Sequence, residues 1–292
     1  MVDKVHFGII DSLGALPVVE SPFELQKFLD KSTAFFGKPH SWLLDNGRMA
    51  MTKLFETMNL AATDEIYITS SFDFPNISAC VTCTIFNFCK PARIITENTK
   101  AIFIIHEFGV PHPRTFELKA LAKERSIPLI EDCAHTINSF FDNGQQVGSI
   151  GDWTIVTFPK IFPVHIGGLL LGNNNLNISS TTNTSVLKEA NVVSSLWDTI
   201  SWITERRAAA YELYIKLLSN SSYEFVFSET KNIAPWFFPL KVGNASKTIG
   251  ILRENNIDCG LWHGTNIVVL PLHQYLTSEE IYYICNLLIK IQ

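Results

Sequence analysis

The sequence predicts an α/β fold with a largely parallel sheet, followed by a smaller α+β region. Through the first two-thirds of the 292 residues, short β-rich apolar runs alternate with stretches of helical spacing. The apolar runs lack strict polar alternation, as expected of strands that are covered on both faces. The composition changes afterwards, and we expect a large domain over 1–190 and a small C-terminal domain over 191–292.

Five apolar runs predict the strands of the large domain, and two amphipathic stretches predict helices between them. The helical stretches are Met49–Met58 and Thr115–Arg125, where apolar residues recur at helical spacing. The predicted strands are 64–70, 100–106, 127–132, 153–158 and 167–172. Ligands of parallel sheets bind beyond the carboxyl ends of the strands, so the residues after these runs are the first candidates for a site.

The last third of the chain predicts a loop, three helices and one strand. The Asn/Ser/Thr-rich stretch Asn173–Asn183 has little to bury and predicts a loop. Thr277 or Ser278 is the expected N-cap of the closing helix, because two glutamates follow in the first turn. The helices and the strand are expected at Trp197–Leu218, 236–240, Ser246–Asn256 and Ser278–Ile289.

Composition and charge exclude several classes of protein. The chain is 47% apolar and 17% charged, which is too hydrophobic for a disordered protein. No apolar stretch reaches the roughly 18 residues that a membrane-spanning helix needs, and no signal-peptide core precedes Asp11. A net charge of −5 without a long basic run argues against a nucleic-acid partner. With only six cysteines, we expect a soluble cytoplasmic protein with free thiols.

Common nucleotide and metal motifs are missing from the sequence. It contains no glycine-rich dinucleotide fingerprint, no P-loop and no His-Glu-x-x-His. Cys80 and Cys83 have a metal-like spacing, but no second pair lies at zinc-site distance, and we expect both to be core thiols. No carboxylate or cysteine cluster accompanies His106 and His112, which we interpret as core or surface histidines.

Two consecutive strand ends carry the residues that point to a chemistry. Asp132 and His135 follow one predicted strand, and Thr157 and Lys160 follow the next. A pyridoxal-phosphate enzyme needs a lysine that forms a Schiff base and a carboxylate that keeps the pyridine nitrogen protonated. Each residue alone has an ordinary explanation as a cap, a loop residue or a surface charge. Only their order and spacing favour the cofactor.

Two further segments supply the other parts that such a site needs. Gly47 and Arg48 open a predicted helix, and Phe74 follows the end of another strand. Amides at a helix start bind phosphate groups, and an aromatic side chain stacks on the cofactor ring. Gly47 taken alone is an ordinary turn residue.

The segments around these residues resemble a known family. A Val-Gly-Ser-Ile-Gly-Asp run at 147–152 follows an Asp-x-Ala-His motif and precedes the lysine strand, and 270–281 looks like a C-terminal motif. Together with 101–109 and 116–125, these segments resemble the DegT/DnrJ/EryC1/StrS family. Its members are fold-type I pyridoxal-phosphate proteins, mostly aminotransferases of nucleotide-linked keto sugars.

The resemblance implies a role for each candidate at the reacting end of the cofactor. Lys160 would form the Schiff base, Asp132 would contact the pyridine nitrogen, and His135 would lie near the phenolic oxygen. Strict register with the commoner form of the family would instead put Phe162 at the lysine position. A shorter variant of the motif fits Lys160 better.

The same resemblance implies how the rest of the cofactor is held. Phe74 would stack on the ring. Gly47 and Arg48, through backbone amides, and the Thr157 hydroxyl would hold the phosphate. The implied cofactor is pyridoxal 5′-phosphate.

The implied reaction moves an amino group from glutamate to a keto sugar nucleotide, within a homodimer. The chain looks shortened relative to the family, and this leaves two alternatives open. One is an impaired member that acts as a binding or regulatory protein. The other is a sugar dehydratase in which a histidine, of which His165 is the nearest, replaces the lysine as base. The segment 262–264 either lines a substrate cleft or forms a structural turn.

Overall fold

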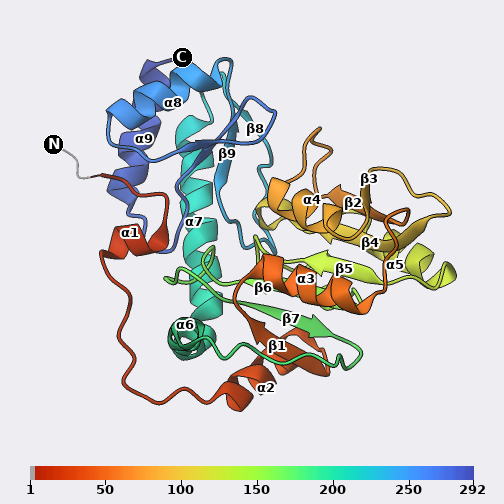
Figure 1. Ribbon diagram of the computed structural model, residues 1–292. Helices are drawn as coiled ribbons and strands as arrows, with labels where there is room; N and C mark the ends of the chain where they lie inside the picture. The colour runs from red at the N-terminus through yellow and green to blue at the C-terminus, as the bar shows by residue number, and fades with distance from the viewer. Residues whose placement is uncertain (1–3) are drawn as a thin grey trace.

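The computed structural model describes residues 4–292, and its larger sheet has seven strands (Figure 1). The strand order is β1-β7-β6-β5-β4-β2-β3. The strands are β1 (His40–Leu44), β2 (Glu65–Ser70), β3 (Lys90–Ala92), β4 (Thr99–Ile105), β5 (Leu129–Asp132), β6 (Trp153–Thr157) and β7 (Gly168–Gly172). The five predicted strands are confirmed, while β1 and β3 were not predicted.

The direction of the strands explains where a site can form. Strands β3, β2, β4, β5 and β6 run parallel, and β7 is antiparallel to both of its neighbours. The register pairs Ile105 of β4 with Asp132 of β5, and Asp132 with Ile155 of β6. These strands therefore end at one edge of the sheet, where the loops that follow them meet. The prediction of a largely parallel α/β sheet is confirmed.

Helices cover both faces of this sheet, which is why its strands are apolar without alternation. Phe103 of β4 lies in the core beneath α3 and α4. Its neighbour Ile102 lies on the opposite face, beneath α5, and α2 and α6 cover the same face over β1 and β7. The helices are α2 (Leu25–Phe36), α3 (Gly47–Thr57), α4 (Ala79–Phe86), α5 (Thr115–Glu124) and α6 (Thr184–Leu196).

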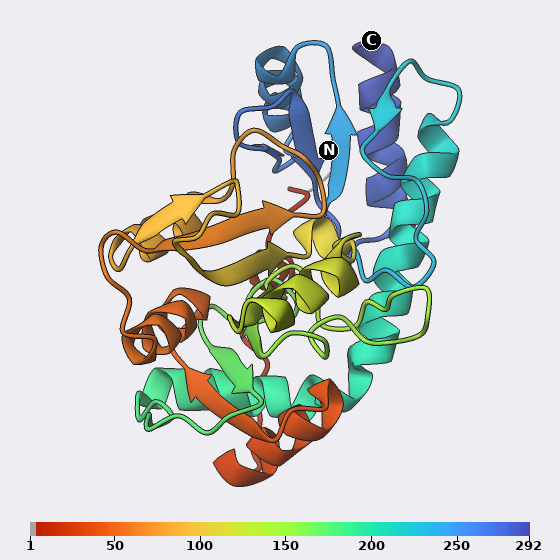
Figure 2. The same cartoon turned by 90° about the vertical axis from the view of Figure 1, so that its right-hand side faces the viewer.

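A second, antiparallel sheet with the order β10-β11-β9-β8 forms the C-terminal part. Helix α7 contributes to both parts, because Ile203 packs in the core beside the larger sheet and Tyr214 packs beneath the second sheet. Figure 2 shows α7 running from beside the larger sheet towards α9. The elements are α7 (Ile200–Leu218), β8 (Glu224–Phe225), β9 (Phe238–Lys241), α8 (Ala245–Glu254), β10 (Gly260–Leu261), β11 (Ile267–Leu270) and α9 (Ser278–Lys290).

The N-terminal residues pack against the C-terminal part. Val5 forms a parallel bridge with Ile257 and belongs to the core of the second sheet. Helix α1 (Ile9–Leu13) follows, and the Ser12 hydroxyl lies 3.0 Å from His273 Nε2. The predicted domain boundary near residue 190 stays a prediction.

Several helices and strands begin at other residues than predicted, each for a local reason. The long helix begins at Ile200, because a 3-10 turn, η2 (Trp197–Thr199), separates it from α6, which was not predicted. Strand β9 begins at Phe238, since the Trp236 amide donates instead to Phe108 O, outside the sheet. Thr277 is the N-cap of α9, in a reciprocal capping box with Glu280. The predicted loop at 173–183 is confirmed.

Candidate active site

The start of α3 comes unusually close to the end of β6. Its N-cap, Asn46, accepts a hydrogen bond from the Met49 amide at 3.0 Å. A Cβ added at the buried Gly47 would lie only 2.5 Å from Thr157 Cγ2. Glycine therefore permits the close approach that brings helix-start amides and a strand-end hydroxyl to one place.

Six of the seven predicted site residues line one cavity of about 210 Å³. We name it the Lys160 cavity; it lies beyond the carboxyl ends of β4, β5 and β6. More distant segments complete it, among them Cys80 at the start of α4, Glu107 after β4, and Trp262. Trp262 thus lines a cavity, while 263–264 form the turn that the other interpretation of this segment expected. Contact of the segment with a substrate stays a prediction. The six predicted residues are Gly47, Arg48, Asp132, His135, Thr157 and Lys160.

Phe74, the seventh predicted residue, does not line the Lys160 cavity. After β2 the chain is tied down by Ser71, whose amide donates to Ile105 O and whose hydroxyl donates to Val110 O. Phe74 then stacks on Phe72, with the ring centroids 5.4 Å apart. The structure therefore places Phe74 in a neighbouring aromatic cluster, and its stacking on a cofactor ring stays a prediction.

Asp132 is a buried acid with little to stabilise its charge. One carboxylate oxygen, Oδ1, accepts a hydrogen bond from the Ala134 amide at 2.9 Å. Burial raises the pKa of Asp132, although the charge of Lys160 and the Ala134 amide oppose that shift. The carboxyl group therefore retains capacity for a further donor or cation in the cavity.

Lys160, rather than Phe162, presents its side chain to this cavity. Phe162 is fully buried in the core, where its ring stacks on Trp197. Lys160 Nζ lies 4.3 Å from the ring centroid of Trp236, in cation–π geometry. Burial lowers the pKa of Lys160, although the nearby Asp132 opposes the shift. The amine is thus easier to deprotonate than an exposed lysine.

His135 is held as a neutral ring. Its Nδ1 accepts a hydrogen bond from the Phe108 amide at 3.1 Å, which assigns the proton to Nε2. Burial, and then the charge of Lys160, lower its pKa well below the ordinary value. Its ring packs on Trp236 at 4.1 Å between centroids. The cavity therefore gains a neutral imidazole fixed in orientation.

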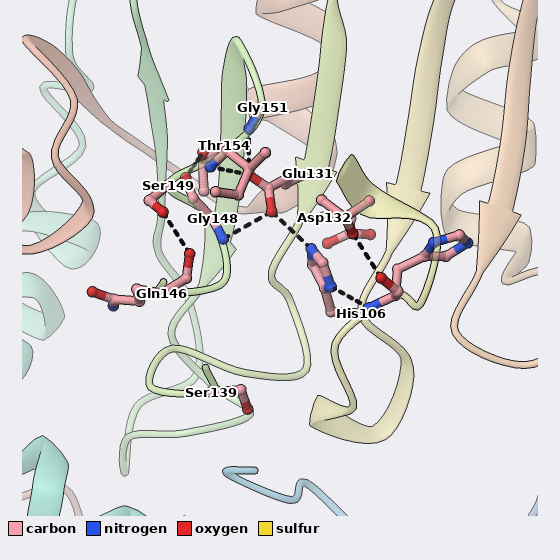
Figure 3. Close-up of polar contacts among 12 residues, drawn as sticks. His106, Glu131, Asp132, Ser139, Gln146, Gly148, Ser149, Gly151 and Thr154 are labelled. Carbon is pink, nitrogen blue, oxygen red and sulfur yellow. Dashed lines mark hydrogen bonds and ion pairs between the residues drawn. The ribbon is translucent and has the colours of Figure 1, made fainter. Parts of the chain in front are cut away.

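A buried network fixes the strand end that carries Asp132 (Figure 3). Glu131 is fully buried, and its carboxylate accepts hydrogen bonds from the amides of Gly148, Ile150 and Gly151. Its Oε2 also lies 3.0 Å from His106 Nε2, which donates because the His112 amide donates to His106 Nδ1. Burial acts to raise the pKa of Glu131, but these donors together lower it. The two histidines are buried, as one of the two interpretations of the sequence held.

Glu107 is a site residue that the sequence interpretation missed. It lines the Lys160 cavity, is 4% exposed, and its Oε2 accepts a hydrogen bond from the Ser70 hydroxyl at 2.8 Å. Burial raises its pKa to about 7, although Ser70 and other neighbours oppose the shift. Glu107 directly follows a predicted strand that ends at His106, and a carboxylate at a strand end was the feature of the sequence that could have identified it.

The prediction that Cys80 and Cys83 are core thiols is wrong. Both are exposed, because α4 buries Val81, Thr84 and Ile85 on its other face. Cys80 lines the Lys160 cavity. All six cysteines are unpaired, as predicted.

Three further observations concern His165, metal ligands and membrane-spanning helices. His165 does not line the Lys160 cavity; its Nδ1 lies 3.4 Å from Glu189 Oε1 near the surface. Residues 4–292 hold no group of three or more His, Cys, Asp or Glu side chains placed to bind a metal ion. Over the same residues, no helix combines the length and hydropathy that a membrane span requires.

Curated relatives match part of the chain. A UDP-4-amino-4,6-dideoxy-N-acetyl-beta-L-altrosamine transaminase of Campylobacter jejuni is 33% identical over 112 residues, or 37% of this chain and 28% of that protein. A GDP-perosamine synthase of Vibrio cholerae is 24% identical over 53% of this chain and 46% of that protein. The matched regions therefore span less than half of the length of these relatives.

Solved structures match nearly the whole fold. A putative sugar aminotransferase from Streptococcus pneumoniae, in its PLP form, has a TM-score of 0.79 over 99% of this chain and 98% of its own, at 15% identity. DesV of S. venezuelae has a TM-score of 0.80 over 99% of both chains, at 14% identity. Likeness at this identity establishes the fold, and the predicted fold class is confirmed.

The matching family model assigns the chain directly. The sequence model of the DegT/DnrJ/EryC1/StrS aminotransferase family matches residues 21–182, which is more than half of the chain. That range contains the start of α3, the ends of β5 and β6, and all seven predicted site residues. The chain belongs to the DegT/DnrJ/EryC1/StrS aminotransferase family.

Proposed function

We propose that this protein is a pyridoxal 5′-phosphate-dependent aminotransferase that moves an amino group from glutamate to a keto sugar carried on a nucleotide. The observation that carries the proposal is the single cavity shared by Lys160, Asp132 and the start of α3. Curated relatives whose names describe transaminases of UDP- and dTDP-linked sugars support the substrate class.

The residues of the Lys160 cavity fit this cofactor. The close approach of Gly47 to Thr157 forms a cradle that a Cβ would fill, and helix-start amides there suit a phosphate group. Asp132 is buried with a single hydrogen-bond donor, so it has room to accept a second from a protonated ring nitrogen. Gly47, Arg48 and Thr157 would hold the phosphate, and His135 would donate from Nε2.

Lys160 would carry the covalent and proton-transfer steps. Pyridoxal phosphate, when bound, supplies an electron sink that stabilises negative charge on the carbon beside the substrate nitrogen. The lowered pKa of Lys160 increases the fraction of free amine, which is the form that attacks a carbonyl carbon. Once the amino donor has displaced it, Lys160 Nζ would take the proton from the α-carbon of the donor.

Asp132 would maintain the charge on which this chemistry depends. A carboxylate beside a protonated ring nitrogen favours both charged forms, so the cation would lower the pKa of Asp132 that burial has raised. His135 would stay neutral and would act as a hydrogen-bond donor rather than as a base. While Lys160 is not bonded to the cofactor, the Trp236 ring would hold its protonated amine in place through the cation–π contact.

The finer assignments are part of the same proposal. Glutamate as the amino donor, a homodimer and a cytoplasmic location rest on the family resemblance. Sedimentation equilibrium tests the dimer, because it would give twice the mass of one chain. A mass equal to one chain at micromolar concentration would contradict it.

The direct experiment mixes the purified protein with pyridoxal phosphate, glutamate and a panel of keto sugar nucleotides. We expect the visible absorption of a lysine Schiff base and amino transfer to at least one nucleotide sugar. Lys160→Ala should lose both, and the matched Lys188→Ala, in α6, should keep both.

The other outcomes separate the alternatives. Protein that stays colourless with saturating cofactor would favour a binding or regulatory role. A visible band with loss of a sugar hydroxyl instead of amino transfer would favour a dehydratase. Full transamination by Lys160→Ala would overturn the assignment of the lysine.

A further inference from the structure

The segment 158–167, which carries Lys160, joins β6 to β7 without forming a helix or a strand. A turn around Lys160 is closed by the Phe162 amide, which donates to Phe158 O at 2.8 Å. In the described part of the chain, no backbone amide donates to the carbonyl oxygen of Lys160 or of Ile161. Ile161 is buried, and a buried carbonyl group without a donor is costly, so this turn needs partners from elsewhere in the fold.

Two buried side chains from the C-terminal third of the chain supply these partners. Arg207, in α7, donates from Nη2 to Lys160 O at 3.0 Å and to Ile161 O at 3.3 Å. Gln274, between β11 and α9, donates from Nε2 to Ile161 O at 3.2 Å. Only 2% of each of the two residues is exposed. The turn that carries the lysine is thus held by residues far away in the sequence.

The same two side chains also fix each other. Arg207 Nε and Nη2 donate to Gln274 Oε1 at 3.2 and 3.1 Å. This contact makes Oε1 the acceptor and leaves the amide N–H groups of Gln274 for Ile161 O. Burial lowers the pKa of Arg207 to about 9, so the guanidinium stays charged at neutral pH. A charged donor forms stronger hydrogen bonds to these oxygens than a neutral donor would.

Holding two consecutive carbonyl groups determines where the lysine side chain leaves the backbone. Because a peptide group is planar, a held carbonyl oxygen fixes the orientation of the whole peptide unit. With the turn held, Lys160 Nζ lies 4.3 Å from the ring centroid of Trp236 and is close enough to Asp132 for their charges to interact. A long lysine side chain on a loose turn would lose more conformational entropy in reaching this place.

We propose that Arg207 and Gln274 are positioning residues, which hold the turn at Lys160 so that its amine stays in the Lys160 cavity. Neither residue lines that cavity, so both act through the backbone of the lysine rather than on a ligand. The part that the amine plays in catalysis rests on the proposed function. Its placement does not, and it is measured separately.

The test follows the acetylation of Lys160 against pH in the full-length protein before cofactor is added. Trace acetic anhydride modifies unprotonated amines, and peptide mass spectrometry gives the pH at which half of Lys160 is deprotonated. The exposed Lys188 serves as the reference for the amount of reagent. Burial lowers the pKa of Lys160 in wild type. Gln274→Leu should raise this midpoint by about 1 pH unit, because the amine gains access to water.

A second variant and a matched control make the result specific. Arg207→Lys keeps the charge but loses the planar group that reaches three oxygens, so we expect a change in the same direction. Tyr214→Phe removes a buried hydrogen bond from α7 to Pro271 O and touches no part of the lysine turn. This control should lower the free energy of unfolding, as the other variants do, and leave the midpoint of Lys160 unchanged.

The titratable groups around the amine are the same in all of these proteins. Asp132, His135, Cys80 and Glu107 line the cavity together with Lys160, and none of them is substituted. A change in the pKa of Lys160 therefore reports a change in the position of its amine.

Titration with pyridoxal phosphate, followed by fluorescence, adds a second measurement. Gln274→Leu should weaken cofactor binding roughly 10-fold, the effect of one lost buried hydrogen bond. Variants of Arg207 and Gln274 that lose stability but keep the wild-type midpoint would overturn the proposal. So would a midpoint of Tyr214→Phe that moves as far as theirs. Wild type without a visible Schiff-base band would reject the transaminase, while the altered midpoints would still support the positioning role.

Discussion

Glu131 and Asp132 are neighbours on β5, both buried, yet they lie in opposite electrostatic environments (Figure 3). Four donors surround the Glu131 carboxylate, and its pKa falls. Only the Ala134 amide donates to Asp132, and burial raises the pKa of this carboxyl group. Consecutive residues of a strand point to opposite faces of the sheet. Glu131 therefore finds hydrogen-bond donors within the fold, while Asp132 points into the Lys160 cavity. The contrast separates a carboxylate that the fold itself satisfies from one that we propose acts on the cofactor.

The largest effect should come from removing the satisfied acid. Glu131→Ala leaves three amides and the His106 ring without an acceptor, so we expect the free energy of unfolding to fall by about 3–5 kcal/mol. Urea titration measures this change. Glu117→Ala, which removes an exposed acid paired with Arg114, should leave the free energy of unfolding nearly unchanged. Equal losses in the two variants would contradict the structural role of Glu131.

Asp132→Asn should change the activity strongly and the stability little. The amide removes a poorly solvated charge, so we expect the unfolding free energy to change by less than about 1 kcal/mol. Amino transfer should fall on the order of 100-fold, because the negative charge that we propose pairs with the ring nitrogen is lost. Parallel urea titrations and initial-rate assays check both parts. A stable variant with wild-type rates would reject Asp132 as the partner of the cofactor.

Glu107, a third buried acid, allows the comparison to be tested by the pH dependence of stability. Its folded pKa of about 7 exceeds its ordinary value of 4.5, so the folded state holds its proton more tightly than the unfolded state. Stability should therefore fall as the pH rises from about 4.5 to 7, by roughly 3 kcal/mol at most. Glu107→Gln should be more stable than wild type at pH 8 and nearly equal to it at pH 4.5. A constant difference across that range would contradict the raised pKa.

The smallest effect is expected at the end of the Lys160 cavity where we propose that the phosphate group binds. Gly47→Ala pushes a Cβ against Thr157 Cγ2, and we expect it to cost about 1 kcal/mol of stability and to weaken cofactor binding. Thr157→Ser removes that methyl group and keeps the hydroxyl. The double variant should therefore recover most of the loss, as measured by fluorescence titration with pyridoxal phosphate. Failure of the second change to rescue the first would show that the close approach is not the cause.

The sequence could predict the part of the site that strands carry. Asp132, His135, Thr157 and Lys160 follow two strands that are consecutive in the chain and adjacent in the sheet, so reading order and spatial order agree. The periodicity of the apolar runs indicates such strands without knowledge of the tertiary fold.

Other parts of the site depend on how distant segments pack. Trp262 reaches the Lys160 cavity only because the second sheet lies beside the ends of the first. Cys80 is exposed because the sheet lies against the other face of α4, and composition alone does not reveal which face is covered. The path of Phe74 depends on hydrogen bonds of Ser71 to residues about 35 positions away.

The central claim is that Lys160 is the residue that bonds to the cofactor. Borohydride reduction of the protein with pyridoxal phosphate, followed by digestion and mass spectrometry, locates the modified lysine. We expect the pyridoxyl group on Lys160, and none in the same peptide of Lys160→Arg. A stoichiometric adduct on another lysine, or bound cofactor with no adduct at all, would contradict the account.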